Sequence, residues 1–561
     1  MSMITSSAWV PRGYATPFPA KQEFDEDEYD RIAALAQLQI DDAKEDLQDA
    51  KAEEGSKPKS NSGAGTKSTS ATEKDKDQLA FLLPFILYYF KTFLYNVTNQ
   101  VDRVEADDDD LKEYDLEHYD DDDDEAEEGQ PMGMFGNIKS LAYHQSNEDD
   151  PYITLKDTKE EDDEEREELQ ILGTDNLLLA TKVEDDVSHL EVYVYEDDAD
   201  NLYTHHDIML PAIPLCVEWL DISINKSGVE KDSRANFVAI GTMDPDIEVW
   251  DLDTVDSMFP NAILGEGGNP EEKTKKKKKK KRAKKANDEY HIDAVLSLAA
   301  NRKHRNLLAS ASADKTVKLW DLHTAKCAKS YTYHTDKVCS LAWHSVESTV
   351  LLSGSYDRTV VAADMRAPDA KAPRWGVESD VENVRWDPHD RNLFYVSTEN
   401  GIVHCYDARN PPSDPAKAQG VWRLQAHDDA VSCLDINPSI PGYMATGSAD
   451  RTVKLWNIQE SGPGMVVSRD LDVGKVFSAT FAPDSEVAFR LAVAGSQGVM
   501  QVWDTSTNVA VRKAFANRIP ASSSDNSEDK LIKVEESDTD SDSEEGEDAG
   551  ADSDEDAMDE D

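Results

Sequence analysis

Two nearly identical eleven-residue strings, SADKTVKLWDL and SADRTVKLWNI, occupy positions 312–322 and 448–458 of the chain. Each string begins with small residues and an aspartate that suit a tight turn, and then alternates apolar and polar residues as a half-buried strand does. The starting positions differ by three steps of about 45 residues, close to the period of propeller repeats. Each string therefore predicts a turn that feeds a strand, in two repeats that are three units apart.

Further apolar strands along the chain end in an aromatic or small residue. Six residues before each of the last six closing residues lies a residue that is mostly able to hydrogen-bond the backbone of its own turn. The closing residues of these seven units are Tyr195, Trp250, Trp320, Ala363, Tyr406, Trp456 and Trp503. The turn residues are Asp244, Asp314, Asp357, Asn400, Asp450 and Gln497.

The units also contain opening, middle and outer strands. PLCVEWL at 214–220 and VENVRWD at 381–387 are opening strands, while VWRLQAH at 421–427 and VAVRKAF at 509–515 are outer strands. Short strands without a helical period over about 360 residues are typical of a propeller, because closure of the ring protects its sheet edges. The sequence therefore predicts an all-β, seven-bladed propeller.

The units resemble WD repeats, in which a loop histidine, a strand hydroxyl, a turn aspartate and a strand tryptophan form a hydrogen-bonded set. The resemblance maps this set onto His291, Ser310 or Ser312, Asp314 and Trp320 in unit three, and onto His427, Thr446 or Ser448, Asp450 and Trp456 in unit six. Unit four keeps His334 and Asp357 but has Ala363 at the tryptophan position, and Trp250 and Trp503 close units two and seven. A histidine, a serine and an aspartate could also suggest a hydrolase, but within one blade they join turn to strand, so we assign them a structural role.

The formal net charge of −56 is concentrated in acidic runs outside the repeats. Blocks of like charge repel each other and stay solvated. We therefore expect a mostly disordered acidic arm over residues 1–130 with a short helix near 25–50, and a disordered, serine-rich acidic tail over 519–561. The propeller is expected over 131–518, with a basic insertion at 262–288.

Candidate chemistry is scarce in this sequence. The five cysteines, all in predicted strands, lack metal-ligand spacing and suit small core residues in a reducing compartment. The phosphate-binding GxxxxGK[ST], the metalloprotease HExxH and the hydrolase GxSxG are all missing from the sequence. We therefore expect no enzyme activity, no catalytic residue, no metal and no cofactor.

The apolar stretch LAFLLPFILYYFKTFLYNV at 79–97 has three readings. A membrane span needs about 20 mainly apolar residues, and Pro84 and Lys91 interrupt this stretch. A short helix that docks on a partner or on the propeller is the second reading. The third is a translated intron in the gene model, because the stretch is rich in residues with A/T-rich codons. We expect no membrane partner.

Two charged segments indicate a cellular location. The run KTKKKKKKKRAKK at 273–285 suits a nuclear or nucleolar localisation signal, an RNA-contacting loop, or both. Its candidate residues are Lys275, Lys276, Lys277, Lys278, Lys279, Lys280, Lys281 and Arg282. In the tail, serines in acidic surroundings are candidate phosphorylation sites. These serines are Ser537, Ser541, Ser543 and Ser553.

The segments before the repeats carry a closer resemblance. SAWVPRGYATPFPAK at 7–21, DEYDRIAALAQLQIDDAKEDL at 27–47 and MFGNIKSLAYH at 134–144 closely resemble the periodic tryptophan protein 1 family of eukaryotic WD-repeat proteins. The resemblance departs at 79–97, where the family has a polar linker. The apolar residues Trp9, Phe18, Ile32 and Leu35 lie in a segment too short to form its own core, so we predict that this segment tethers the chain to a partner, with packing on the blades as the competing alternative.

The resemblance implies a scaffold of ribosome biogenesis in the nucleolus, active in large-subunit assembly and ribosomal RNA processing. Its implied partner is the pre-ribosomal particle, with its ribosomal proteins, assembly factors and ribosomal RNA. The alternative is a chromatin-binding WD-repeat protein that contacts histones and regulates transcription of ribosomal DNA.

Overall fold

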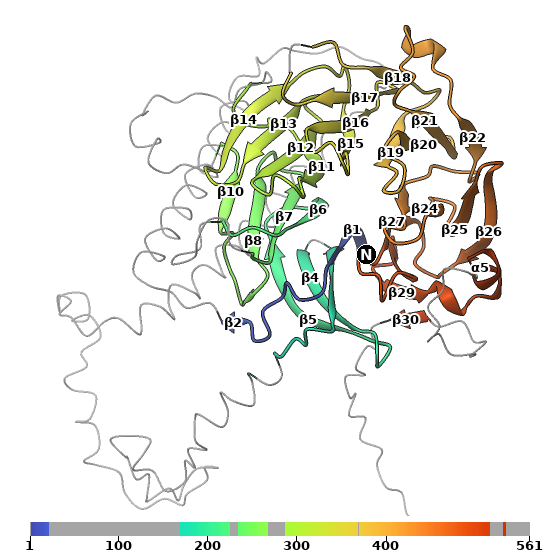
Figure 1. The fold of residues 1–561 in the computed structure, drawn as a ribbon. Helices are drawn as coiled ribbons and strands as arrows, with labels where there is room; N and C mark the ends of the chain where they lie inside the picture. Colours follow the sequence, from blue (N-terminus) through green and yellow to red (C-terminus); the bar gives the residue numbers. More distant parts are fainter. Residues whose placement is uncertain are drawn as a thin grey trace, which may run out of the picture. The chain divides into compact units, whose positions relative to one another are not determined.

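A computed structural model describes residues 2–21, 166, 169–185, 187–224, 234–266, 287–367, 370–515 and 531–533. Within these residues, seven four-stranded antiparallel sheets follow one another around a ring (Figure 1). The predicted seven-bladed, all-β propeller is therefore confirmed. Several predicted features lie outside the described residues: the helix near 25–50, the stretch at 79–97, the lysine-rich run Lys275–Arg282 and the four tail serines.

Blades 2 to 6 each consist of four strands that lie close together in the sequence. Blade 2 contains β6 (Pro214–Leu220), β7 (Phe237–Thr242), β8 (Ile247–Asp251) and β10 (Ala262–Leu264). Blade 3 contains β11 (Val295–Ala300), β12 (Leu307–Ser312), β13 (Val317–Asp321) and β14 (Lys326–Tyr331). Blade 4 contains β15 (Val338–Trp343), β16 (Val350–Ser355), β17 (Thr359–Asp364) and β18 (Arg374–Gly376).

Blades 5 and 6 repeat the pattern. Blade 5 contains β19 (Val381–Trp386), β20 (Leu393–Thr398), β21 (Ile402–Asp407) and β22 (Trp422–Gln425), with a short 3-10 helix η4 (Pro415–Lys417). Blade 6 contains β23 (Cys433–Ile436), β24 (Tyr443–Gly447), β25 (Thr452–Gln459) and β26 (Gly462–Asp470). Since β10 is the outer strand of blade 2, the basic insertion does not begin at residue 262 as predicted.

The hydrophobic core lies between neighbouring blades. The second strands β7 (FVAIGT) and β24 (YMATG) are buried along their whole length, because both of their faces contact other sheets. Trp320 of blade 3 packs with Phe237 of blade 2, and both side chains are almost fully buried. A tryptophan that closes a third strand therefore belongs to the interface between two blades.

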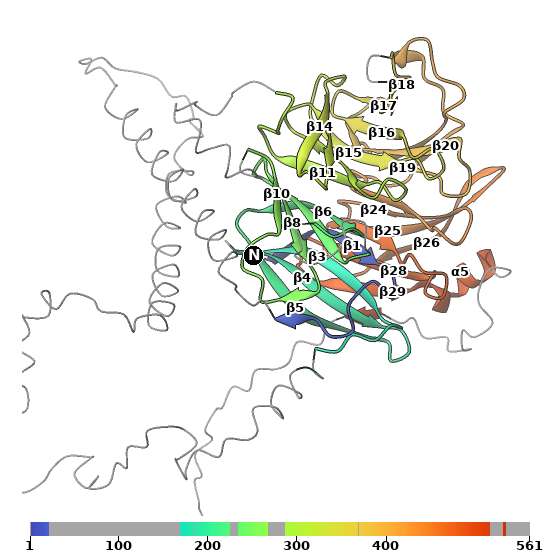
Figure 2. The same ribbon diagram turned by 60° about the vertical axis from the view of Figure 1, so that its left-hand side comes forward.

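Blade 1 differs from the predicted plan in the origin of its innermost strand. The blade contains β3 (Asn176–Glu184), β4 (Val187–Glu196) and β5 (Asn201–Leu210), and its fourth strand is β1 (Ser2–Val10), from the start of the chain. β1 pairs antiparallel with β3 and contacts β6 and β27, the innermost strands of blades 2 and 7. Figures 1 and 2 show β1 inside the ring beside these strands. The predicted boundary that assigned all of residues 1–130 to a disordered arm is therefore wrong for this segment.

Blade 7 closes the ring against β1. It contains β27 (Val476–Phe481), β28 (Arg490–Gly495), β29 (Met500–Asp504) and an outer strand β30 (Leu531–Lys533). VAVRKAF, predicted as the outer strand, instead forms the helix α5 (Val509–Ala514), after the 3-10 helix η5 (Thr505–Thr507). The Asn508 side chain accepts hydrogen bonds from the first turn of α5 and starts this helix. The propeller therefore extends past the predicted end at residue 518.

The acidic segment after β1 is anchored at both of its ends. β2 (Ala20–Lys21) pairs in parallel with β9 (Thr254–Val255) of the blade 2 connection. On the return side, the Ile171 amide donates to the Pro17 carbonyl at 3.0 Å. The chain therefore leaves and re-enters blade 1 at neighbouring points, so this segment is an insertion within a blade.

Candidate functional site

In blade 3 the structure brings together the histidine, hydroxyl, aspartate and tryptophan of the WD set. His291 Nδ1 lies 2.9 Å from Asp314 Oδ2, and His291 Nε2 lies 2.7 Å from Ser310 Oγ. Trp320 Nε1 donates to the same Ser310 oxygen at 2.8 Å. Of the two serines that the sequence left open, Ser310 is therefore the member of the set, and Ser312 instead accepts from the Asp314 amide.

The donors and acceptors of this set form one directional chain. The tryptophan N–H can only donate, so the Ser310 oxygen accepts from it. The Ser310 O–H then donates a hydrogen bond to His291 Nε2, and the His291 Nδ1–H donates to Asp314. Burial lowers the pKa of His291, so the imidazole of this residue stays neutral in this arrangement. Burial would raise the pKa of Asp314, but hydrogen bonds from His291 and Thr316 outweigh it and lower the pKa to about 2.

Blade 6 repeats the set with threonine in place of serine. His427 contacts Asp450 at 2.9 Å and Thr446 Oγ1 at 2.8 Å, and Trp456 Nε1 donates to Thr446 at 2.9 Å. Thr446 is therefore the member of the set that the sequence left open between it and Ser448. His427, Thr446 and Trp456 are buried inside the blade and Asp450 is partly buried, so the arrangement fixes the turn to the strand.

The remaining blades keep only parts of the set. In blade 4, His334 contacts Asp357 and Ser353, but Ala363 supplies no donor to Ser353. In blade 2, Trp250 Nε1 donates to Glu248 Oε2 at 3.2 Å. In blade 7, Trp503 Nε1 has no partner among the described residues.

The neutral histidines make the stability of the ring pH dependent. Burial lowers the pKa of His291 and His427 below the ordinary 6.5, so in a window below about pH 6.5 the unfolded chain binds more protons than the folded one. We expect the melting temperature to fall as the pH is lowered through this window, and a His291→Asn variant to show a shallower pH dependence than the native chain. His304→Asn, at an exposed histidine, is the matched control. An equal pH dependence in all three proteins would contradict the assignment.

The turn aspartates also shape one face of the ring. Each is followed by a residue with positive φ, namely Lys315 (71°), Arg358 (63°) and Arg451 (69°) in blades 3, 4 and 6. Lys315 reaches the Thr335 carbonyl at 3.0 Å and Arg358 reaches Asp380 at 3.0 Å, both in the loop before the next blade. These turns therefore link neighbouring blades and leave charged side chains on the face.

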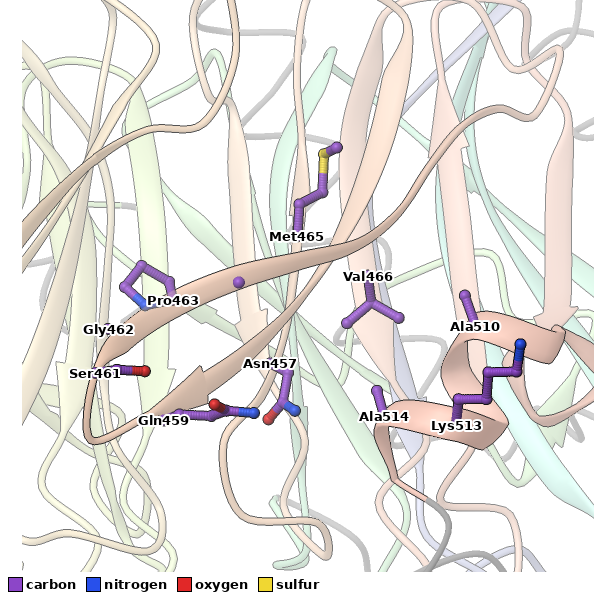
Figure 3. Close-up of a pocket in the computed structure, with 11 residues that line it drawn as sticks. Asn457, Gln459, Ser461, Gly462, Pro463, Met465, Val466, Ala510, Lys513 and Ala514 are labelled. Carbon is purple, nitrogen blue, oxygen red and sulfur yellow. The ribbon is translucent and has the colours of Figure 1, made fainter.

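A shallow groove of about 520 Å³ lies between the β25–β26 hairpin and α5 (Figure 3). Val466 of β26 faces Ala510 and Ala514 of the helix, whereas Met465 points away from it, and Lys513 is the one charged residue in the lining. The lining contains no carboxylate, imidazole or thiol. The groove therefore offers no pair of groups for general acid–base or nucleophilic chemistry.

The described residues contain neither a group of metal-binding side chains nor a membrane-spanning helix. In the part of the chain that the structure describes, no three His, Cys, Asp or Glu side chains are grouped so that they could hold a metal ion. Among the same residues, no helix is long and apolar enough to cross a membrane. The stretch at 79–97 is not among them.

The residues that close the ring were not identified from the sequence. Trp9 Nε1 donates to the Thr480 carbonyl of blade 7 at 3.0 Å. Trp343 and Trp386 make the same bond to the preceding blade, to Ala299 at 2.9 Å and Ala342 at 3.2 Å. The signal was present, because SAWVP around Trp9 matches LAWHS and VRWDP in blades 4 and 5. The predicted tether is therefore wrong for Trp9, and its competing alternative, a contact with the blades, is correct.

Comparisons with known proteins agree with this geometry. A family model described as "WD domain, G-beta repeat" matches residues 288–321, 325–361 and 419–457, the three units that contain a His–Asp pair. An uncharacterized WD repeat-containing protein of Schizosaccharomyces pombe is 51% identical over 92% of this chain and 92% of its own length. Periodic tryptophan protein 1 of Saccharomyces cerevisiae is 38% identical over 92% of this chain and 90% of its own length. The Periodic tryptophan protein 1 homolog of Drosophila melanogaster is 30% identical over 64% of this chain and 73% of its own length. The chain therefore belongs to the periodic tryptophan protein 1 family of WD-repeat proteins.

Proposed function

We propose that this protein is a non-enzymatic scaffold of ribosome biogenesis that acts in large-subunit assembly and ribosomal RNA processing. The observation that carries the proposal is the similarity over nearly the whole chain to the periodic tryptophan protein 1 family, whose resemblance implies this role. The proposed partner is the pre-ribosomal particle, with its ribosomal proteins, assembly factors and RNA.

The architecture of the described residues supports a scaffold. Their buried polar networks fix turns to strands within the blades, and the groove beside α5 lacks acid–base groups. A rigid ring of this kind presents separate loops on its two faces and outer strands on its rim. Such a surface suits simultaneous contacts with several partners.

The proposed location is the nucleus and the nucleolus. The lysine-rich run at 273–285 supports it, because such runs serve as nuclear localisation signals and as phosphate-contacting loops. The described residues Glu266 and Asn287 flank the insertion that contains this run. The run therefore lies in the connection between blades 2 and 3.

Sedimentation of nuclear extract tests the proposal. We expect the tagged full-length chain to co-sediment with particles that contain precursor large-subunit RNA, and to move to lighter fractions after RNase treatment of the extract. Both RNA hybridisation and the position of the tag are measured across the gradient. Co-purification with nucleosomes, together with no signal in the pre-ribosomal fractions, would favour the histone-binding alternative and overturn the proposal.

A further inference from the structure

The loop between β11 and β12 of blade 3 concentrates positive charge in the sequence RKHR, residues 302–305. Asn301 holds this loop in place, because its Nδ2 donates to the Ser348 carbonyl at 2.6 Å and its Oδ1 accepts from the amides of Lys303 and His304 at 3.1 and 2.9 Å. The side chains of Arg302, Lys303 and His304 are exposed. The loop is therefore ordered before any partner binds, which lowers the entropic cost of binding.

The cations of this loop differ in how far neighbouring groups neutralise them. Arg302 stacks over the Trp219 ring at 5.0 Å and pairs with Glu218 at 2.9 Å, while half of its side chain remains exposed. Lys303 Nζ donates to the Val346 carbonyl at 2.6 Å. Since a carbonyl carries no net charge, the positive charge of Lys303 is not compensated by this contact.

The outer strand β14 of the same blade carries further exposed positive charges. Lys326 and Lys329 of this strand are exposed, and neither has a carboxylate within ion-pair distance among the described residues. Two contacts join the loop to the end of β13 and to the turn that leads into β14: the Leu322 amide donates to the Asn306 carbonyl at 2.8 Å, and Asn306 Nδ2 donates to Asp321 at 3.1 Å. The exposed lysines of loop and strand therefore belong to one edge of one blade.

The other end of β14 lies close to Asn287, the first described residue after the basic insertion. Lys318 Nζ donates both to Ser330 Oγ of β14, at 2.9 Å, and to the Asn287 carbonyl. The residue at which the chain returns from the insertion is therefore held beside β14, next to Lys329.

We propose that this blade 3 edge, formed by Arg302, Lys303, Lys326 and Lys329, binds the phosphodiester backbone of single-stranded RNA. The proposal rests on the proposed function and goes beyond it, since it assigns the RNA contact to a folded surface. A row of exposed cations along a strand suits a linear polyanion, whereas an acidic protein segment would also need an apolar pocket, and the described groove lies on blades 6 and 7. The proposed contact is independent of base sequence, because contacts to phosphates carry no sequence information.

Fluorescence anisotropy with a labelled 20-nucleotide oligo(U) RNA tests this proposal. The test uses the full-length chain with Lys275–Lys281 replaced by Ser, so that the insertion does not dominate binding. In this background, Lys303→Ser, Lys326→Ser and Lys329→Ser together remove three phosphate contacts. Because each contact contributes about 0.7 to the salt slope, we expect the slope to fall by about 2 and the affinity near 0.1 M salt to fall about 100-fold.

The matched control removes the same charge elsewhere. Lys417→Ser, Lys475→Ser and Lys513→Ser together change three exposed lysines on blades 5 and 7 and on α5. We expect the control to keep its salt slope and to lose little affinity, and both variants to keep the melting temperature of the background protein. Equal losses in the two variants, or no loss in the edge variant, would overturn the proposal.

Three further outcomes separate this inference from others. Tighter binding of poly-glutamate than of oligo(U) by the blade 3 edge would overturn it in favour of an acidic protein partner. If the edge variant binds RNA normally while the native chain co-sediments with pre-ribosomal particles, this inference fails and the proposed function stands. If the edge binds oligo(U) but the chain never enters those particles, the proposed function fails and the RNA contact stands.

Discussion

Removal of residues 1–21 is expected to leave the chain unable to close its ring. The deletion removes β1, the innermost strand of blade 1, and with it the fully buried Ile4 and Val10 and the nearly buried Trp9. Truncation of one such core side chain already costs about 2 to 5 kcal/mol, and a domain is stable by only about 5 to 15 kcal/mol. Loss of the cooperative thermal transition, followed by circular dichroism, is the expected result.

A point variant and an internal deletion make this prediction sharper. Trp9→Ala in the full chain is expected to destabilise the ring by about 3 to 5 kcal/mol, measured by denaturant unfolding, because it removes both a buried indole and its bond to Thr480. The matched control deletes residues 40–156, which lie outside the described residues, and joins the ends with a Gly/Ser linker. This control is expected to keep the native melting temperature. If the chain without residues 1–21 melted at the native temperature, the assignment of β1 to blade 1 would be wrong.

Trp320→Ala is expected to cost about 3 to 5 kcal/mol of unfolding free energy. The indole is 1% exposed and packs between blades 2 and 3, and its N–H is the first donor of the chain that ends at Asp314. The variant therefore opens a cavity at a blade interface and removes a hydrogen bond from the buried Ser310. Urea unfolding of the purified protein measures the cost.

Substitution by phenylalanine separates packing from hydrogen bonding. Trp320→Phe removes the donor to Ser310, whereas Trp503→Phe, also at a fully buried site, removes an N–H that has no partner among the described residues. We expect the first variant to cost about 1 kcal/mol more than the second. Equal costs would show that the hydrogen bond adds nothing to the stability of blade 3.

Repetition in the sequence explains why most of the propeller could be predicted. The closing residues and the turn residues six positions before them recur in the last six units, so a single pattern locates the second and third strands of blades 2 to 7. VAVRKAF was assigned to the wrong element because its apolar residues fit a short strand as well as one helical turn. The Asn508 cap and the later β30 strand decided between them.

The innermost strand of blade 1 was missed because strand pairing does not require nearness in the chain. SMITSSAWV lacks the turn and the third strand that identify the other units, since its neighbours β3 and β27 lie far along the sequence. The hydroxyl of the WD set was also left open. Ser310 and Ser312 both lie on β12 and their side chains point to the same face, so only the packed structure shows which one reaches His291.

Because β1 comes from the start of the chain, it is synthesised long before its neighbour in blade 7. The ribosome makes β1 hundreds of residues before β27, the strand whose Thr480 carbonyl receives the Trp9 indole. At about 5 to 20 residues per second, the interval between the two strands is on the order of 25 to 100 s. During this time β1 can pair with β3 but lacks its neighbour in blade 7, so every copy of the protein passes through a period in which chaperones can bind the uncovered side of SMITSSAWV.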